Sequence, residues 1–428
     1  MQTTIKPLLE KPQNKKNHNY HPVWVSQLIN PQFYSSRVWL VIILAVGWGV
    51  NSCDDGNLVD SSPGGDEVQV KADTALIPST QEVSAPGFSG NQQYLSVGHY
   101  NDLLFGEKEV TALLQPNIIE EGIDSIESNA TAFLEMHVDE VYGNVTSSNH
   151  LQLNEAPRRW RASAWRPDSA MQVSDILVGE SIHEPEDETV TIPVDDNWLQ
   201  RYREYFNEGD EDGYREELFG FTLTSLEESN ILSFDMGQSQ LVIDNPTADT
   251  LQSTGFRATA YSLERGEPSE SITEEVSINR NTFDNFMKLE FDVDSDFIGA
   301  DNISRAELII YVDSESMESA EYLPENHQRN EADVLDMYFL DESDLELSIT
   351  DDPLFRVSLN EGEDGNPDYF SVNLTAFIRD QLTADEQEEE DFYLIISENN
   401  GKLLSSLLFN HLHDEYAPQI HITSADPN

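Results

Sequence analysis

The chain has 428 residues, with 81 acidic residues against 23 lysines and arginines, a formal net charge of −58 and a sequence pI near 4.1. Charge of this sign repels nucleic acid, so the composition argues against nucleic acid as a partner. A single cysteine excludes a disulfide within the chain. The length suffices for two domains of ordinary size, and a hydrophobic content of 38% is low but above that of a disordered chain.

Residues 1–53 have the composition of a secretory signal. Basic residues precede the apolar run VWLVIILAVGWGV, which starts at Val38. A helix of this run would be about 20 Å long, too short for a hydrocarbon core of about 30 Å, so a signal peptide fits better. The following Val50-Asn51-Ser52-Cys53 resembles a bacterial lipobox. The resemblance implies acylation of Cys53 and anchoring of the protein by lipid in the cell envelope, at the outer membrane. A plain signal peptide or a short anchor helix is the alternative.

Residues 54–92 are rich in Asp, Gly, Ser, Pro and Glu and show no apolar period. This composition predicts an acidic, flexible tether. The acidity of the whole chain is most simply explained by a saline habitat, because at about 1 M salt the Debye length is only about 3 Å and self-repulsion is screened.

From residue 93 onward, short segments alternate apolar and polar residues between Gly, Asn, Asp and Pro turns, which predicts antiparallel β-structure. The pattern recurs roughly 175 residues later in the chain. In each half a strand leads into a short amphipathic helix, near Trp198 and near Phe377. The matching apolar positions are Ala132, Leu134, Met136 and Val138 in one half and Ala306, Leu308, Ile310 and Val312 in the other. The predicted fold is all-β, with two tandem, jelly-roll-like antiparallel β-sandwich domains over 93–250 and 251–428.

Two sequence stretches resemble known families. Val372-Asn373-Leu374-Thr375, the segment PQIHIT from Pro418 and the segment GFTL from Gly220 resemble DNRLRE-type β-sandwich domains, relatives of carbohydrate-binding modules. The DNRLRE hexapeptide itself is absent. The segment SVGHYNDLLFGEKEVTALLQ, from Ser96, resembles the opening of an uncharacterised family of Bacteroidota surface lipoproteins. The first resemblance implies glycan binding, and the second implies no particular activity.

One short segment concentrates positive charge and tryptophan. The run RRWRASAWR contains Arg158, Arg159, Trp160, Arg161, Trp165 and Arg166. Guanidinium groups bind carboxylate or sulfate in bidentate fashion and indole rings stack on sugars, so an acidic polysaccharide is a candidate ligand. Alternatively, the tryptophans fill the core and the arginines pair with surrounding acids.

Two patterns are candidate metal sites, although no cofactor is predicted. Asp292, Asp294 and Asp296 resemble the start of a calcium loop, but Phe297 and Ile303 stand where an EF-hand needs Gly and Glu. The acidic turn from Glu361 offers a further candidate for Ca²⁺. In so acidic a chain, a solvated turn is the alternative in both places.

No nucleophile, phosphate-binding or dinucleotide motif occurs in the sequence. The leading hypothesis is a non-enzymatic, lipid-anchored envelope protein with a structural, adhesion or assembly role. The second is a polysaccharide-binding module for glycan capture or uptake. The third is a carboxylate-based glycoside hydrolase or lyase, which would need two acids about 5–10 Å apart in a cleft.

Overall fold

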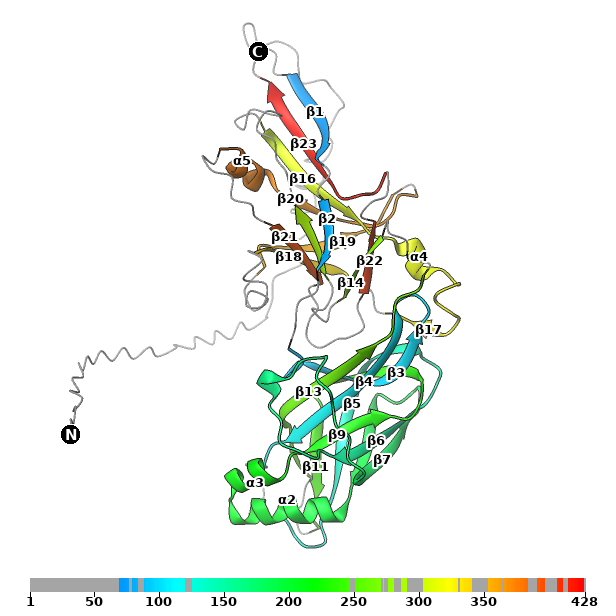
Figure 1. Ribbon diagram of the computed structural model, residues 1–428. Helices are drawn as coiled ribbons and strands as arrows, with labels where there is room; N and C mark the ends of the chain where they lie inside the picture. The colour runs from blue at the N-terminus through cyan, green and yellow to red at the C-terminus, as the bar shows by residue number, and fades with distance from the viewer. Residues whose placement is uncertain are drawn as a thin grey trace, which may run out of the picture. The chain divides into compact units, whose positions relative to one another are not determined.

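In the computed structural model, most of the described chain forms antiparallel β-sheets with a few short helices (Figure 1). The structure describes residues 69–76, 79–83, 88–119, 125–246, 251–270, 272, 276–280, 286–290, 303–329, 332–340, 353–363, 365–383, 391–396, 406–410 and 415–426. The predicted signal, Cys53 and much of the predicted tether lie outside these residues. Among the helices that are described, none is long and apolar enough to cross a membrane.

The larger sheet is formed mainly from the first half of the chain. Its strands, in spatial order, are β12 (Gln252–Thr254), β11 (Gln240–Asp244), β5 (Thr131–Asn144), β10 (Ser229–Asp235), β3 (Tyr94–Asp102), β4 (Gly106–Pro116), β9 (Phe221–Ser225), β6 (Asn149–Glu155) and β7 (Leu177–His183). In addition, β13 (Phe256–Arg265) pairs with β4, while β8 (Thr189–Val194) and β17 (His327–Gln328) pair with β5.

The second half of the chain forms most of the remaining sheets. The spatial order in the second sheet is β1 (Gln69–Leu76), β23 (Gln419–Asp426), β16 (Ile303–Tyr311), β20 (Tyr369–Asn373), β19 (Phe355–Asn360), β18 (Val334–Leu340), β21 (Asp391–Ile396), β15 (Phe286–Glu290) and β2 (Ser79–Val83). A two-stranded sheet pairs β14 (Val276–Arg280) with β22 (Ser406–Asn410). The helical segments are η1 (Ala162–Ala164), α2 (Asp196–Glu208), α3 (Glu211–Glu217), α4 (Ser314–Glu318) and α5 (Thr375–Thr383).

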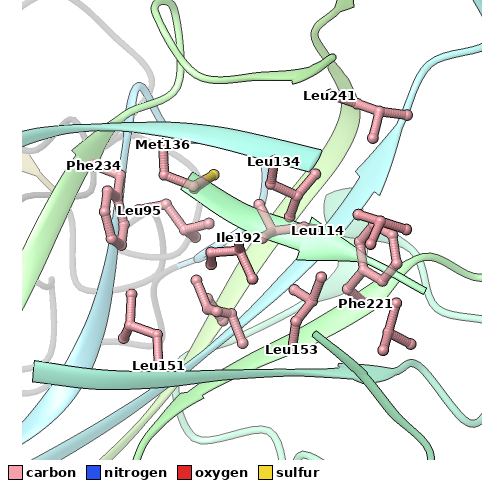
Figure 2. Packing of buried hydrophobic residues seen from close by; sticks show 14 of the residues in the cluster. Leu95, Leu114, Leu134, Met136, Leu151, Leu153, Ile192, Phe221, Phe234 and Leu241 are labelled. Atoms are coloured by element: carbon pink, nitrogen blue, oxygen red, sulfur yellow. The ribbon is translucent and has the colours of Figure 1, made fainter. Parts of the chain in front are cut away.

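The larger sheet curls around an apolar core. The predicted alternation on β5 places Leu134 and Met136 in this core, both fully buried, because successive side chains of a strand point to opposite faces. Figure 2 shows their side chains meeting those of other strands, among them Leu153 and Ile192. The sheet brings β7 beside β8, where the Asp195 N–H donates to the Val178 carbonyl at 2.8 Å.

The two halves repeat one pattern of strand pairing. In the first half β5 lies between β8 and β11, and in the second half β16 lies between β20 and β23. Likewise, β9 bridges β4 and β6 as β21 bridges β15 and β18. The central pairs are Leu134 with Ile192 and Leu241, and Leu308 with Val372 and Ile420. The predicted strands of both halves, and the helices α2 and α5, are therefore confirmed as elements.

Each half receives two edge strands from outside its own predicted range. β12 and β13, which open the second half, pair with β11 and β4 of the first. β1 and β2, which precede the first half, pair with β23 and β15 of the second. Two strands thus lie inside the range predicted to be a tether, and residues 66–428 form one structural unit.

The turn between β3 and β4 also joins the two halves. Leu104 and Phe105 of this turn belong to the apolar core of the second half, in which Leu308 and Phe370 lie. Gly106 follows with a φ of +83°, and a Cβ there would lie 2.4 Å from the Glu267 carbonyl oxygen, so only glycine fits this turn.

We predict that Phe105→Ala lowers the free energy of unfolding by about 3–5 kcal/mol, because it removes a buried aromatic ring and leaves a cavity. Phe105 is 1% exposed, whereas Leu103, two residues earlier, is 46% exposed. Leu103→Ala is therefore the matched control, with an expected loss within about 0.5 kcal/mol. Urea unfolding of both variants measures the difference, and equal losses would contradict the placement of Phe105.

Candidate functional site

The arginine- and tryptophan-rich segment lies in the long connection between β6 and β7. Trp160 donates from Nε1 to the Phe219 carbonyl at 2.9 Å, and Trp165 donates from Nε1 to Ser262 Oγ at 3.3 Å. Both partly buried rings pack against a small apolar cluster that contains Leu113 of β4 and Ala260 of β13. The connection is thereby fixed to these two strands.

Backbone contacts hold the same connection close to the segment that leads into β3. The Ser89 N–H donates to the Trp165 carbonyl at 3.0 Å. A Cβ on Gly90 would lie 1.9 Å from the Ala162 carbonyl oxygen, so a glycine is required where the two chain segments approach. The guanidinium group of Arg159 and its neighbours are therefore presented from a backbone that is anchored on several sides.

Four arginines line one cavity of about 280 Å³, which we call the arginine pocket. Arg159 and Arg161 come from the connection, Arg215 from α3 and Arg257 from β13. The remaining lining residues are Asn91, Gln115, Trp160, Ala162, Ser163, Phe219 and Ala258. Four positive side chains around one cavity are unexpected in a chain with a net charge of −58.

The helix that carries Arg215 is held in place by capping and by tyrosine hydrogen bonds. Asp210 caps α3 by accepting from the Gly213 N–H at 2.9 Å, and Tyr214 donates from its hydroxyl to the Pro116 carbonyl at 2.7 Å. Gln115, at the end of β4, donates from Nε2 to the Leu218 carbonyl at 2.8 Å. These contacts fix α3 against the end of β4, where the pocket lies.

Three of the four arginines have no acidic partner among the described residues. Arg215 forms ion pairs with Glu211 at 2.7 Å and Asp212 at 3.8 Å. Across the described part of the chain, Arg159, Arg161 and Arg257 form neither an ion pair nor a side-chain hydrogen bond. Partial burial lowers the pKa of Arg257, and the positive charges of Arg215 and Arg159 lower it further, while Tyr214 and the charge of Glu211 oppose the shift. The pocket therefore concentrates positive charge that an anion would neutralise.

The residues of the predicted segment RRWRASAWR occupy different positions relative to the arginine pocket. Trp160 lines the arginine pocket, whereas Trp165 packs edge-on against it with ring centroids 6.3 Å apart. Arg158 is exposed and does not line the pocket, and the guanidinium carbon of Arg166 lies 5.5 Å from the centroid of the Phe88 ring. No sequence pattern joins Arg215 and Arg257 to this segment, because they lie on elements far away in the chain.

A second cluster of charged residues lies buried beneath the turn between β3 and β4. The Asp102 side chain is fully buried and accepts two hydrogen bonds from Arg329, at 2.7 and 2.8 Å. It also accepts from the Tyr142 hydroxyl and from the backbone N–H groups of Leu104 and Phe105. Burial by itself would raise the pKa of Asp102, but these hydrogen bonds and nearby cations hold it below its usual value.

Lys108 also belongs to this cluster. It is buried, it donates to the Tyr142 hydroxyl at 2.9 Å, and its Nζ lies 4.3 Å from the centroid of the Tyr142 ring. Burial lowers the pKa of Lys108 to about 7; Asp102 opposes this shift, whereas Arg265, Arg280 and Arg329 add to it. Lys108 does not line the arginine pocket, so we assign the cluster a structural role.

Of the two candidate calcium sites, only the acidic turn from Glu361 lies largely within the described residues. Asp292, Asp294 and Asp296 lie outside the described residues. In the acidic turn, the Gly362 N–H donates to Asp368 Oδ1 at 2.8 Å, and Asp368 Oδ2 accepts from the Ser314 hydroxyl at 2.9 Å. Within the described ranges, no group of three or more His, Cys, Asp or Glu side chains is arranged to hold a metal ion.

Comparisons with known proteins add little to this description. No protein-family model matches the chain, and no curated protein matches it. A solved structure titled BspA_C_WT aligns with 77% of this chain and 90% of its own, at 10% identity and a TM-score of 0.16. A TM-score this low supports no conclusion about fold or function.

We predict that Lys108→Met makes stability less dependent on pH. Between a folded pKa of about 7 and the ordinary lysine value of 10.5, the unfolded chain holds a proton that the folded chain lacks. Unfolding then takes up a proton, so the stability of the wild type rises with pH by up to about 1.4 kcal/mol per unit. The variant lacks this contribution. Its stability relative to the wild type is expected to be greatest at pH 6 and to fall steadily toward pH 9.

Urea unfolding at pH 6, 7, 8 and 9 in about 1 M NaCl measures this difference with charge repulsion screened. Tyr142→Phe is the control, because it removes the hydroxyl that Lys108 contacts but keeps the lysine, so the slope should persist. An unchanged slope in Lys108→Met would show that another group titrates.

Proposed function

We propose that this chain is a non-enzymatic, lipid-anchored protein of the cell envelope that binds an acidic polysaccharide at the arginine pocket. The observation that carries this proposal is the convergence of Arg159, Arg161, Arg215 and Arg257 on one cavity beside Trp160. Arginine forks recognise planar or tetrahedral anions through paired N–H donors. Binding at this site would serve glycan capture or adhesion.

The proposed architecture is two related, jelly-roll-like β-sandwich domains built on the two repeats. The shared pairing of β5 and β16 with equivalent neighbours supports this interpretation. The resemblance to DNRLRE-type domains and to Bacteroidota surface lipoproteins agrees with it, and a relationship to carbohydrate-binding modules would suit a glycan ligand. Acylation of Cys53 would hold these domains at the outer membrane.

We predict that Cys53→Ser abolishes lipid labelling and releases the protein from the membrane fraction. Several acyl chains anchor a protein stably, whereas one chain alone binds only marginally. Metabolic labelling with a fatty acid and fractionation of membranes measure both effects. Ser52→Ala, a change beside the cysteine that keeps its thiol, is the control and should remain labelled. A labelled, membrane-bound Cys53→Ser protein would contradict the anchor.

We predict that Arg159→Gln and Arg161→Gln each weaken binding of acidic polysaccharide by about tenfold or more, because a hydrogen bond to a charged group contributes about 1.5–3 kcal/mol. Arg158→Gln removes the same charge from the neighbouring position outside the pocket and should bind normally. A glycan array in about 0.5 M NaCl identifies the ligand with long-range repulsion reduced. The proposal fails if no acidic glycan binds or if all three variants behave alike.

A further inference from the structure

The number of free guanidinium groups in the arginine pocket bears on the chemistry of its ligand. A carboxylate has two oxygens in one plane, and one arginine fork satisfies both. The monoester of a sulfate or phosphate has three terminal oxygens at tetrahedral angles, and three strong acceptors of this kind suit several donors approaching from different directions. Within the described residues, Arg159, Arg161 and Arg257 are the pocket arginines that lack an acidic partner.

These three arginines come from two elements of the structure. Arg159 and Arg161 flank Trp160 in the connection after β6, and Arg257 lies on β13. They therefore reach one cavity from two elements that the chain does not link locally. Arg215, whose charge is compensated by Glu211 and Asp212, adds a fourth guanidinium group to the same lining.

The charge balance of the cavity bears on how much negative charge its ligand carries. The only acids that form ion pairs with pocket arginines, within the described residues, both contact Arg215. Three pocket arginines are thus left without an ion pair, and a phosphate monoester, with close to two negative charges at pH 7, neutralises more of their charge than a carboxylate or a sulfate monoester, which each carry one. Desolvation is the main cause of the lowered pKa of Arg257, and repulsion from Arg215 and Arg159 adds to it; an anion that contacts several of these arginines at once relieves this repulsion most.

The size of the cavity limits how much ligand it holds. Its volume of about 280 Å³ lies just below the range of about 300–1,000 Å³ typical of sites for drug-sized ligands. A cavity of this size accommodates an oxyanion together with part of one sugar ring. The remainder of a polymer would stay outside it.

We infer that the arginine pocket binds the tetrahedral oxyanion of a sulfate or phosphate monoester on a glycan, in preference to the planar carboxylate of a uronic acid. This inference rests on the proposed function and names the anionic group at the same site. The shared chemistry of the two esters is three terminal oxygens around one centre. The two differ in charge, because a phosphate monoester carries close to two negative charges at pH 7.

Calorimetric titration of the full chain with three matched methyl galactosides tests the preference. The probes carry a 6-sulfate, a 6-phosphate or, as the galacturonide, a 6-carboxylate. The inference expects at least one ester to bind about tenfold or more tightly than the uronide, the equivalent of about 1.4 kcal/mol. The sulfate and phosphate arms then show which ester the site accepts. Competition between a sulfated galactan and a polygalacturonate repeats the ranking with polymers, should the single sugars bind too weakly to measure.

Two variants test whether the esters bind at the arginine pocket. Arg257→Gln should lower ester affinity about tenfold or more, because it removes a charged donor. Arg158→Gln should leave affinity unchanged, because this residue lies outside the pocket. A uronide or polyuronate that binds as tightly as the esters overturns the inference but leaves the proposed function standing. Loss of affinity in both variants equally also overturns it. The absence of binding by every acidic sugar and polymer overturns both.

Discussion

The joining of the two halves depends on the ion pair between the buried carboxylate of Asp102 and the guanidinium group of Arg329. A charge removed from water is tolerated only when hydrogen bonds and an opposite charge replace its hydration. Asp102 obtains both from Arg329, which also donates to the carbonyls of Met317 at 2.6 Å and Tyr322 at 2.5 Å. One guanidinium group thereby fixes the segment between α4 and β17 to the turn between β3 and β4. Loss of either partner of a buried pair typically costs about 3–5 kcal/mol, since it leaves the other charge uncompensated.

Exchange of edge strands adds a second connection between the halves. An unpaired edge exposes a row of backbone donors and acceptors, so each sheet gains from a strand that covers it. In this chain β13 covers β4 of the first half, and β2 covers β15 of the second. Because β13 opens the second half and β2 precedes the first, a cut between residues 250 and 251 would expose both edges. The sequence repeat and the structural unit therefore have different boundaries.

Sequence periodicity predicted the local elements and missed the long-range contacts. The alternation of Leu134 and Met136, or of Leu308 and Ile310, is a property of neighbouring residues, and it identified β5 and β16 with their buried faces. No local pattern indicates that the acidic region before residue 92 contains strands that pair with the end of the chain. Arg159 and Arg161 stand in a segment that is visibly rich in Arg and Trp, whereas no local pattern marks Arg257 as part of the same site. Its approach to them depends on the pairing of β13 with β4.

Net charge and local charge act at different distances in this molecule. The net charge of −58 repels an acidic polymer over a range of about 10 Å at 0.1 M salt, but over only about 3 Å at 1 M. A direct contact with a guanidinium group of the arginine pocket would be shorter than either distance, so salt would screen it less than the long-range repulsion. Raising the salt concentration would therefore weaken the repulsion more than the contacts with the proposed ligand. If the arginine pocket binds an anion as proposed, binding by this acidic chain should be stronger in brine than in dilute buffer, the reverse of what is expected of an overall basic protein.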